Sequence, residues 1–164
     1  MARQTFFSFH FERDVWRAAQ VRNSWLVRGE KTDAGFWDAA AWEEVKKKGN
    51  DAVHAWIDKQ LDGTSVTVVL IGAETSTRPY VDYEIKKSYE KGNGLLGIYI
   101  HNMKDVNGKT DTKGANPFDR WHVTDKDGKK TYFSAMYSTY DWVNDDGRKN
   151  IGAWIEAAAK KAGR

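Results

Sequence analysis

The chain of 164 residues contains no cysteine, no hydrophobic run of membrane-spanning length and no large excess of one charge. The lack of cysteine excludes thiol catalysis, cysteine-ligated metal sites and a disulfide framework, and it agrees with a reducing compartment. The opening sequence MARQTFFSFHFERD lacks the apolar core and cleavage site of a signal peptide. We therefore expect a cytoplasmic protein with no membrane partner.

Charge and length narrow the class further. The 26 basic and 23 acidic residues give a formal charge of +3 and a pI near 9.0, which is only a weak sign of a basic surface. Because these charges are spread along the chain, we expect no nucleic-acid partner. A chain of this length is the size of one ordinary domain and can bury a core without disulfides or metal. We expect a single domain over residues 1–164.

Several signature motifs are also missing. The sequence has no G-x-x-x-x-G-K-[ST] and no G-x-S-x-G, which removes the usual P-loop and α/β-hydrolase interpretations. The segment GNGLLG, residues 92–97, does match G-x-G-x-x-G, but it leads from a predicted helix into a strand. Glycines that hold a pyrophosphate lie between a strand and the following helix, so this match is a coincidence.

The four histidines give no sign of a metal site, because none of them stands at a ligand spacing from another: His10, His54, His101 and His122. A phosphoacceptor receiver domain would need an aspartate at the end of its third strand, and SVTVVLIG ends without one. We expect no bound metal.

Hydrophobic periodicity alternates between strands and helices along most of the chain. The aromatic segment Thr5–Phe11 predicts a strand, and the continuous β-branched run Ser65–Gly72 predicts a central parallel strand covered on both faces. GLLGIYIH predicts another strand, and RKNIGAWIEAAAKKAG predicts a closing helix. The pattern predicts an α/β fold of the flavodoxin-like kind: a doubly wound, mainly parallel central sheet with helices on both faces and a C-terminal hairpin and helix extension.

The remaining segments yield weaker expectations. GFWDAAAW fits either a short strand or an irregular loop, and DAVHAWIDKQL fits a helix capped by Asn50 or Asp51. HVTDKDGKKTYF predicts a hairpin with its turn at Asp127 and Gly128. TYFSAMYSTYDW is expected to continue as a strand.

Glu84 occupies an unusual position in the predicted helix that begins at Pro79. Val81, Ile85 and Tyr89 form its inward apolar stripe, and Glu84 flanks that stripe near the start of the helix. An acid there would interact favourably with the helix dipole without any function. A functional interpretation gains weight if polar residues from other segments converge on it.

Such convergence is expected at the carboxyl ends of the strands, where ligands bind in doubly wound sheets. Ser8, His10, Glu12 and Asp14 follow the first strand, and Glu74–Arg78 together with Glu84 follow the central one. The polar segment Asn102–Asp119 follows the next strand and should border the same crevice. The sequence therefore predicts that Ser8 and His10 lie beside Glu84.

Two stretches resemble the Toll/interleukin-1 receptor (TIR) domains, and more closely the TIR-like Thoeris antiphage-defence proteins of the ThsB type. FFSFHFERD is similar to their first strand and loop, and TSVTVVLIGAETSTRPYVDYEIKKSYEKGNGLLGIYIHN is similar to their third strand, catalytic helix and fourth strand. The family motif W-x-x-x-E becomes Tyr80-Val-Asp-Tyr-Glu84 here, and KGANPFD resembles a Thoeris loop.

The resemblance implies an activity and a set of site residues. It implies cleavage of the nicotinamide–ribose bond of NAD⁺ as substrate, with no cofactor, and cyclisation of the remainder into a cyclic ADP-ribose isomer. Glu84 falls on the catalytic glutamate, and the expected substrate-binding residues are Phe6, Ser8, His10, Tyr80 and Tyr83. The implied partners are NAD⁺, a downstream effector reached through the diffusible nucleotide, and further copies of the chain on activation.

Two other functions remain open from the sequence. One is a non-enzymatic TIR-like module that signals by assembling with similar domains. The other is a flavodoxin-like domain that binds a different nucleotide without turning it over.

Overall fold

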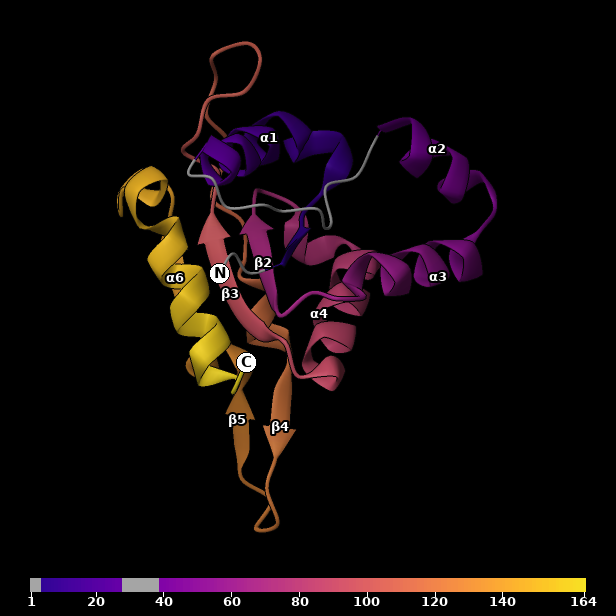
Figure 1. Cartoon of the computed structure of the whole chain (residues 1–164), viewed down its shortest axis with the longest axis vertical. Coiled ribbons are helices and arrows are strands. Elements are labelled where there is room, and N and C mark those ends of the chain that lie inside the picture. The colour runs from indigo at the N-terminus through magenta and orange to yellow at the C-terminus, as the bar shows by residue number, and fades with distance from the viewer. Residues whose placement is uncertain (1–3, 28–38) are drawn as a thin grey trace.

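A four-stranded parallel sheet lies at the centre of the computed structural model, which describes residues 4–27 and 39–164 (Figure 1). The strand order is β1-β2-β3-β6, and each neighbouring pair is parallel. The strands are β1 (Thr5–Ser8), β2 (Val66–Ile71), β3 (Gly94–Tyr99) and β6 (Thr139–Asp141). The predicted α/β class with a mainly parallel sheet is confirmed.

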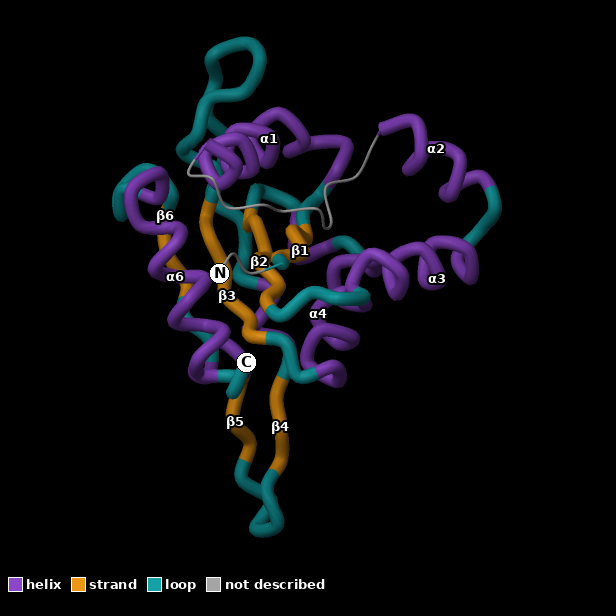
Figure 2. Tube along the Cα trace, in the orientation of Figure 1, coloured by secondary structure: helices purple, strands orange, loops and turns teal. Residues whose placement is uncertain are grey.

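Helices cover both faces of this sheet (Figure 2). The α-helices are α1 (Phe11–Val27), α2 (Ala39–Lys47), α3 (Asn50–Leu61), α4 (Pro79–Lys91), α5 (Phe133–Met136) and α6 (Gly147–Lys161), and the short 3₁₀ turns are η1 (Thr75–Thr77) and η2 (Pro117–Arg120). The apolar faces of α1 and α6 pack with Val66, Val68 and Leu70 on one side of β2. Val69 and Ile71 point to the other side and pack against α4.

Strand β2 is the interior strand that its composition predicts. All six of its residues are buried, and it pairs with β1 on one edge and β3 on the other. Successive side chains point to opposite faces of a strand. A run of apolar residues without polar alternation is therefore stable only where helices cover both faces.

The two ends of helix α4 are set by a proline and a glycine. Pro79 stands in the first turn, where a missing N–H costs nothing, and Gly92 ends the helix with a positive φ of 84°. Its buried face contains Val81 and Ile85, as expected, but Tyr89 is 41% exposed. Glu84 and Ser88 are buried in its place, so the inward face of this helix is partly polar.

Two predictions for the segments that precede β2, the cap of α3 and the structure of GFWDAAAW, are wrong. Gly49, with a φ of 98°, occupies the cap position of α3, and no side chain caps the helix. Asn50 is instead the first helical residue. Part of GFWDAAAW belongs to α2 rather than to a strand, and its residues 35–38 lie outside the described part of the chain.

The predicted hairpin projects from the amino-end side of the sheet (Figure 1). Strands β4 (His122–Thr124) and β5 (Lys130–Tyr132) are antiparallel, and of the two predicted turn residues only Gly128 has a positive φ. The segment after it is not a continuous strand. The single turn α5 interrupts it and buries Phe133 against the α4 side of the sheet, which redirects the chain from the exposed hairpin to β6.

The long polar segment after β3 lies at the carboxyl edge of the sheet, as predicted. Asp111 accepts two hydrogen bonds from Arg13 of α1, at 2.8 and 2.9 Å. The backbone of Gly114 packs directly on the end of β2, because a Cβ built on it would lie 2.1 Å from the Gly72 carbonyl oxygen. The loop is thus fastened to the edge where ligands bind in such sheets.

A search of the described residues finds no helix that is both long enough and apolar enough to span a bilayer.

Gly114→Ala should lower the free energy of unfolding by about 1–3 kcal/mol, because the added methyl group overlaps backbone atoms that cannot move aside cheaply. Denaturant unfolding of the purified variant measures this change. The neighbouring exposed substitution Ala115→Ser is the control and should shift stability by under about 0.5 kcal/mol. Equal stability of Gly114→Ala and the parent would show that the loop is not packed this closely.

Candidate active site

Glu84 is fully buried in the described structure, with 0% exposure. Its Oε1 accepts a hydrogen bond of 3.0 Å from the Ser8 hydroxyl, and its Oε2 has no hydrogen-bond partner within the described part of the chain. A solvated acid that interacts only with the helix dipole does not need this position. The dipole interpretation of Glu84 is therefore insufficient, because burying a carboxylate with one unpartnered oxygen is costly.

Burial sets the protonation of this side chain. It raises the pKa of Glu84 well above its ordinary value, and the Ser8 hydrogen bond opposes the rise. Desolvation disfavours the charged form, whereas a donor aimed at the carboxylate favours it. The ligand-free structure consequently favours the uncharged acid, and a cation beside Glu84 would favour the carboxylate.

Ser8 is brought to Glu84 by the pairing of β1 with β2. It is the last residue of β1, lies opposite Val69 and has no exposed surface. The predicted proximity of Ser8 and Glu84 is confirmed. Phe6 stands two residues earlier on the same face of the strand, but its ring is also fully buried in the core.

His10 follows β1 and is 4% exposed. Its Nε2 lies 3.3 Å from a carboxylate oxygen of Glu12, while Nδ1 finds no partner among the described residues. Burial and the nearby charge of Arg78 lower its pKa, although Glu12 acts in the opposite direction. The neutral imidazole is therefore the favoured form at this edge.

Tyr80 lies one helical turn before Glu84 and packs against Trp42 of α2. The Tyr80 hydroxyl accepts a 3.4 Å hydrogen bond from the backbone N–H of Phe11, and burial followed by the charge of Glu12 raises its pKa, with a smaller contribution from Glu84. Trp42 of α2 meets the Tyr80 ring edge-on, with ring centroids 5.3 Å apart. An ion pair of 2.7 Å between Lys46 and Glu12 fastens α2 to the start of α1.

Tyr83 lies on another side of the same helix. Its ring stacks on His54 at 3.9 Å, and its hydroxyl donates to Asp58 at 2.8 Å. These contacts join α4 to α3 and do not bring Tyr83 to the Glu84 carboxyl group. Asp82 likewise points away, because its carboxylate pairs with Arg120 at 2.7 Å.

The described residues contain no cluster of three or more metal-ligating side chains. They do contain the charged residues of the segment Glu74–Arg78, which the sequence places at the carboxyl edge without giving them a role in the site. Glu74 contacts both Arg13 and Arg78, at 3.3 and 3.2 Å. One local signal pointed to Arg78, since it directly precedes Pro79 and so had to lie at the start of α4.

Glu84→Gln should raise the melting temperature at pH 7 and leave it nearly unchanged at pH 4. A raised folded-state pKa means that the unfolded chain ionises first, so wild-type stability falls as the pH rises above about 4.5, the ordinary value of a glutamate. Glutamine has no such loss, and each pKa unit of difference corresponds to about 1.4 kcal/mol. Thermal unfolding from pH 4 to 8 measures the effect.

The exposed Glu90 on the same helix provides the matched control. Glu90→Gln should change stability by under about 0.5 kcal/mol, with no gain that grows with pH. A Glu84→Gln variant that is less stable than the parent at pH 7 would contradict the burial argument.

Comparison of the sequence with known proteins identifies the family of this chain. The model of the TIR-like domain of the Thoeris protein ThsB matches residues 6–105, which include β1, α4 and β3. A Bacillus cereus (strain MSX-D12) protein named ThsB1, proposed to be a cyclic ADP-D-ribose synthase, is 36% identical over 191 residues, covering 94% of this chain and 100% of that protein. The chain therefore belongs to the ThsB family of Thoeris proteins, which contain a TIR-like domain.

Proposed function

We propose that this protein cleaves the nicotinamide–ribose bond of NAD⁺ and joins the remaining ADP-ribose into a cyclic ADP-ribose isomer. The product would act as a diffusible messenger to a separate effector in Thoeris antiphage defence. The observation that carries the proposal is the buried carboxyl group of Glu84, which accepts a hydrogen bond from Ser8 at one oxygen and has no partner for the other among the described residues. The name of the Bacillus cereus relative supports the same reaction class.

One carboxylate is enough for the bond cleavage. The C1′–N bond breaks with its electron pair going to nitrogen, so nicotinamide leaves as a neutral base and needs no general acid. Positive charge then develops on the ribose ring, and a fixed carboxylate stabilises it where water is scarce. Glu84 takes this role, and the cationic nicotinamide ring of the substrate favours its ionised form.

Ring closure follows when the ribosyl C1′ is captured within the same molecule. An adenine nitrogen or a ribose hydroxyl donates an electron pair to C1′, and one proton is released. NAD⁺ thus becomes one cyclic nucleotide, one nicotinamide and one proton. Exclusion of water favours this capture over hydrolysis.

The side chains that shield Glu84 must move before NAD⁺ reaches it, because the carboxyl group has no exposed surface, and we propose that Tyr80 and Trp42 are part of this cover. The ion pair between Lys46 and Glu12 is partly exposed, and such pairs contribute about 0–1 kcal/mol. Opening at α2 would also expose Trp42, which is 2% exposed, and burial of a large apolar side chain contributes about 1.5–3 kcal/mol. We propose that the site opens here for substrate and closes over it during the reaction.

Glu84→Gln should lower NAD⁺ turnover by about 10²–10³, because glutamine keeps the size of the side chain and removes the charge that stabilises the ribosyl cation. Mass spectrometry of NAD⁺ incubated with purified protein, following nicotinamide, ADP-ribose and the cyclic product, measures it. Asp82→Asn is the matched control on the same helix, since Asp82 pairs with Arg120. Parental turnover by Glu84→Gln would refute the assignment, and no turnover by the parent would favour a non-enzymatic module.

Ser8→Ala should move the acid limb of the pH profile of kcat/KM to higher pH. Loss of the Ser8 donor raises the pKa of Glu84 further, so a higher pH is needed to form the active carboxylate. Ser88→Ala is the control, because it removes a buried hydroxyl of α4 that bonds to Thr67 at 2.7 Å and not to Glu84. If both variants show the same acid limb, Ser8 has only a packing role.

A further inference from the structure

Two arginine side chains from separate elements converge on a single carboxylate at the carboxyl edge of the sheet. Glu74 places one oxygen 3.3 Å from Nη1 of Arg13 and the other 3.2 Å from Nη2 of Arg78. Arg13 belongs to the first turn of α1, and Arg78 caps the start of α4. The two guanidinium groups therefore flank a single carboxylate.

A ligand anion could replace the Glu74 carboxylate at little cost in free energy. The side chains of Glu74, Arg13 and Arg78 are 44%, 39% and 36% exposed, so water screens their ion pairs. Arg13 uses Nε and Nη2 for Asp111, which fixes its orientation and leaves Nη1 for the anion.

Two buried polar atoms near this point lack partners in the described structure. They are Nε of Arg78 and Nδ1 of His10, and the His10 ring lies within the electrostatic influence of Arg78, Arg13 and Glu74. Buried polar atoms are normally hydrogen-bonded, so an unpartnered pair calls for an explanation. Acceptor oxygens of a ligand would satisfy the Nε–H of Arg78, whereas Nδ1 of the neutral His10 ring, whose Nε2–H faces Glu12, is an acceptor and would need a donor such as a ribose hydroxyl.

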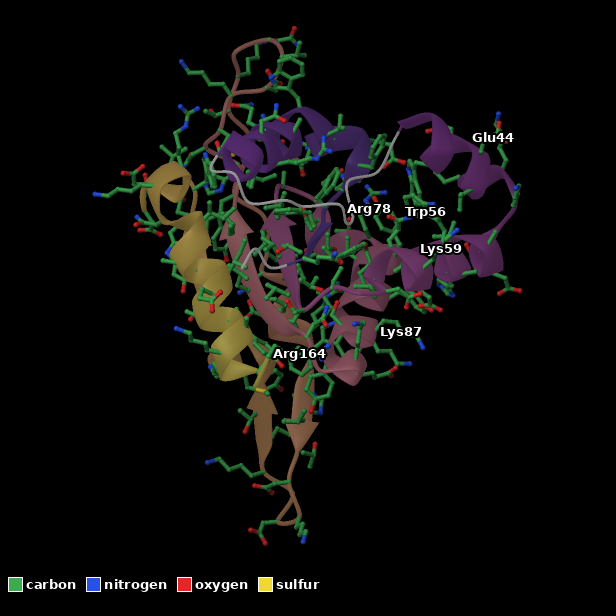
Figure 3. The ribbon with its side chains drawn as sticks, in the orientation of Figure 1. Glu44, Trp56, Lys59, Arg78, Lys87 and Arg164 are labelled. Atoms are coloured by element: carbon green, nitrogen blue, oxygen red, sulfur yellow. The ribbon has the colours of Figure 1, made fainter. Side chains whose placement is uncertain are left out.

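The spacing along α4 suits one part of a dinucleotide. Arg78 and Glu84 are six residues apart, which is about 9 Å along a helix axis at 1.5 Å per residue. If the nicotinamide ribose lies at Glu84, the diphosphate extends from the ribose 5′ carbon and is the next charged group. Figure 3 shows Arg78 at the end of α4 that lies near the carboxyl edge of the sheet, well away from Lys87.

We propose that Arg13 and Arg78 bind the diphosphate of NAD⁺, and that Glu74 occupies their site until the dinucleotide displaces it. The inference rests on the proposed function. A diphosphate carries two negative charges and more acceptor oxygens than a carboxylate, which suits two guanidinium groups and the positive end of α4. Arg13 and Arg78 would thus select dinucleotides over nicotinamide riboside, and Glu74 would weaken binding of free anions.

Equilibrium binding tests this without relying on turnover. Calorimetry would use Glu84→Gln protein, to slow cleavage, with NAD⁺, inorganic pyrophosphate and nicotinamide riboside as probes. Adding Arg78→Gln should weaken binding of NAD⁺ and pyrophosphate about tenfold to a hundredfold, as expected for lost charge-assisted hydrogen bonds, and leave nicotinamide riboside unaffected. Adding Glu74→Gln should strengthen NAD⁺ and pyrophosphate binding several-fold.

Lys87→Gln is the matched control, because Lys87 lies on the same helix, is 37% exposed and pairs with Glu90. Equal effects of Arg78→Gln and Lys87→Gln, weaker binding in Glu74→Gln, or no binding of NAD⁺ and pyrophosphate at all would each overturn the proposal. Failure of the diphosphate site and failure of the proposed function give different results. Cleavage by the wild type with unchanged affinity in Arg78→Gln refutes only the diphosphate site, whereas binding with the expected pattern but no cleavage refutes only the catalytic function.

Discussion

The buried hydrogen bond from Ser8 to Glu84 is the interaction on which the candidate site depends. It joins the end of β1 to α4 through two residues that are 76 positions apart in the sequence. It is also the only hydrogen bond that the described structure gives to the Glu84 carboxyl group. Removing a carboxylate from water is unfavourable, and a single hydroxyl donor compensates only part of that cost. The fold thus keeps a destabilising group in its core, as expected where a side chain serves chemistry rather than stability.

The surroundings of Glu84 explain why such a group could be useful. In a water-poor site a carboxylate stabilises a developing cation far more strongly than it would in water. Under the proposed function, burial of Glu84 also means that the substrate enters by displacing neighbouring side chains, and a movement of α2 would break the contacts of Trp42 with Tyr80 and of Lys46 with Glu12. Strong electrostatics and restricted access are consequences of the same burial.

The charged groups at the carboxyl edge are exposed to solvent, unlike Glu84, so their interactions are weaker. Glu74, Arg13 and Arg78 are partly exposed, so their mutual attraction is weak and reversible, whereas the orientation of Arg13 is fixed by Asp111. A site made of exposed ion pairs can exchange one anion for another at little cost. Weak contacts near solvent and a strongly perturbed carboxyl group in the interior together suit the binding and cleavage of a charged dinucleotide.

The sequence alone determined the class of the fold, the interior position of Ser65–Gly72 and the start of the Glu84 helix at Pro79, because periodicity and proline chemistry act locally. The proximity of Ser8 to that helix followed from the fold class, because the carboxyl ends of parallel strands share one edge of the sheet. The sequence pattern failed at α5, where burial of Phe133 overrides a strand-like pattern. Only the tertiary structure decided the burial of Glu84, the contact of Trp42 with Tyr80 and the convergence of Arg13 and Arg78 on Glu74. Each of these joins residues far apart in the chain, and no local pattern records which side chains meet when distant segments pack.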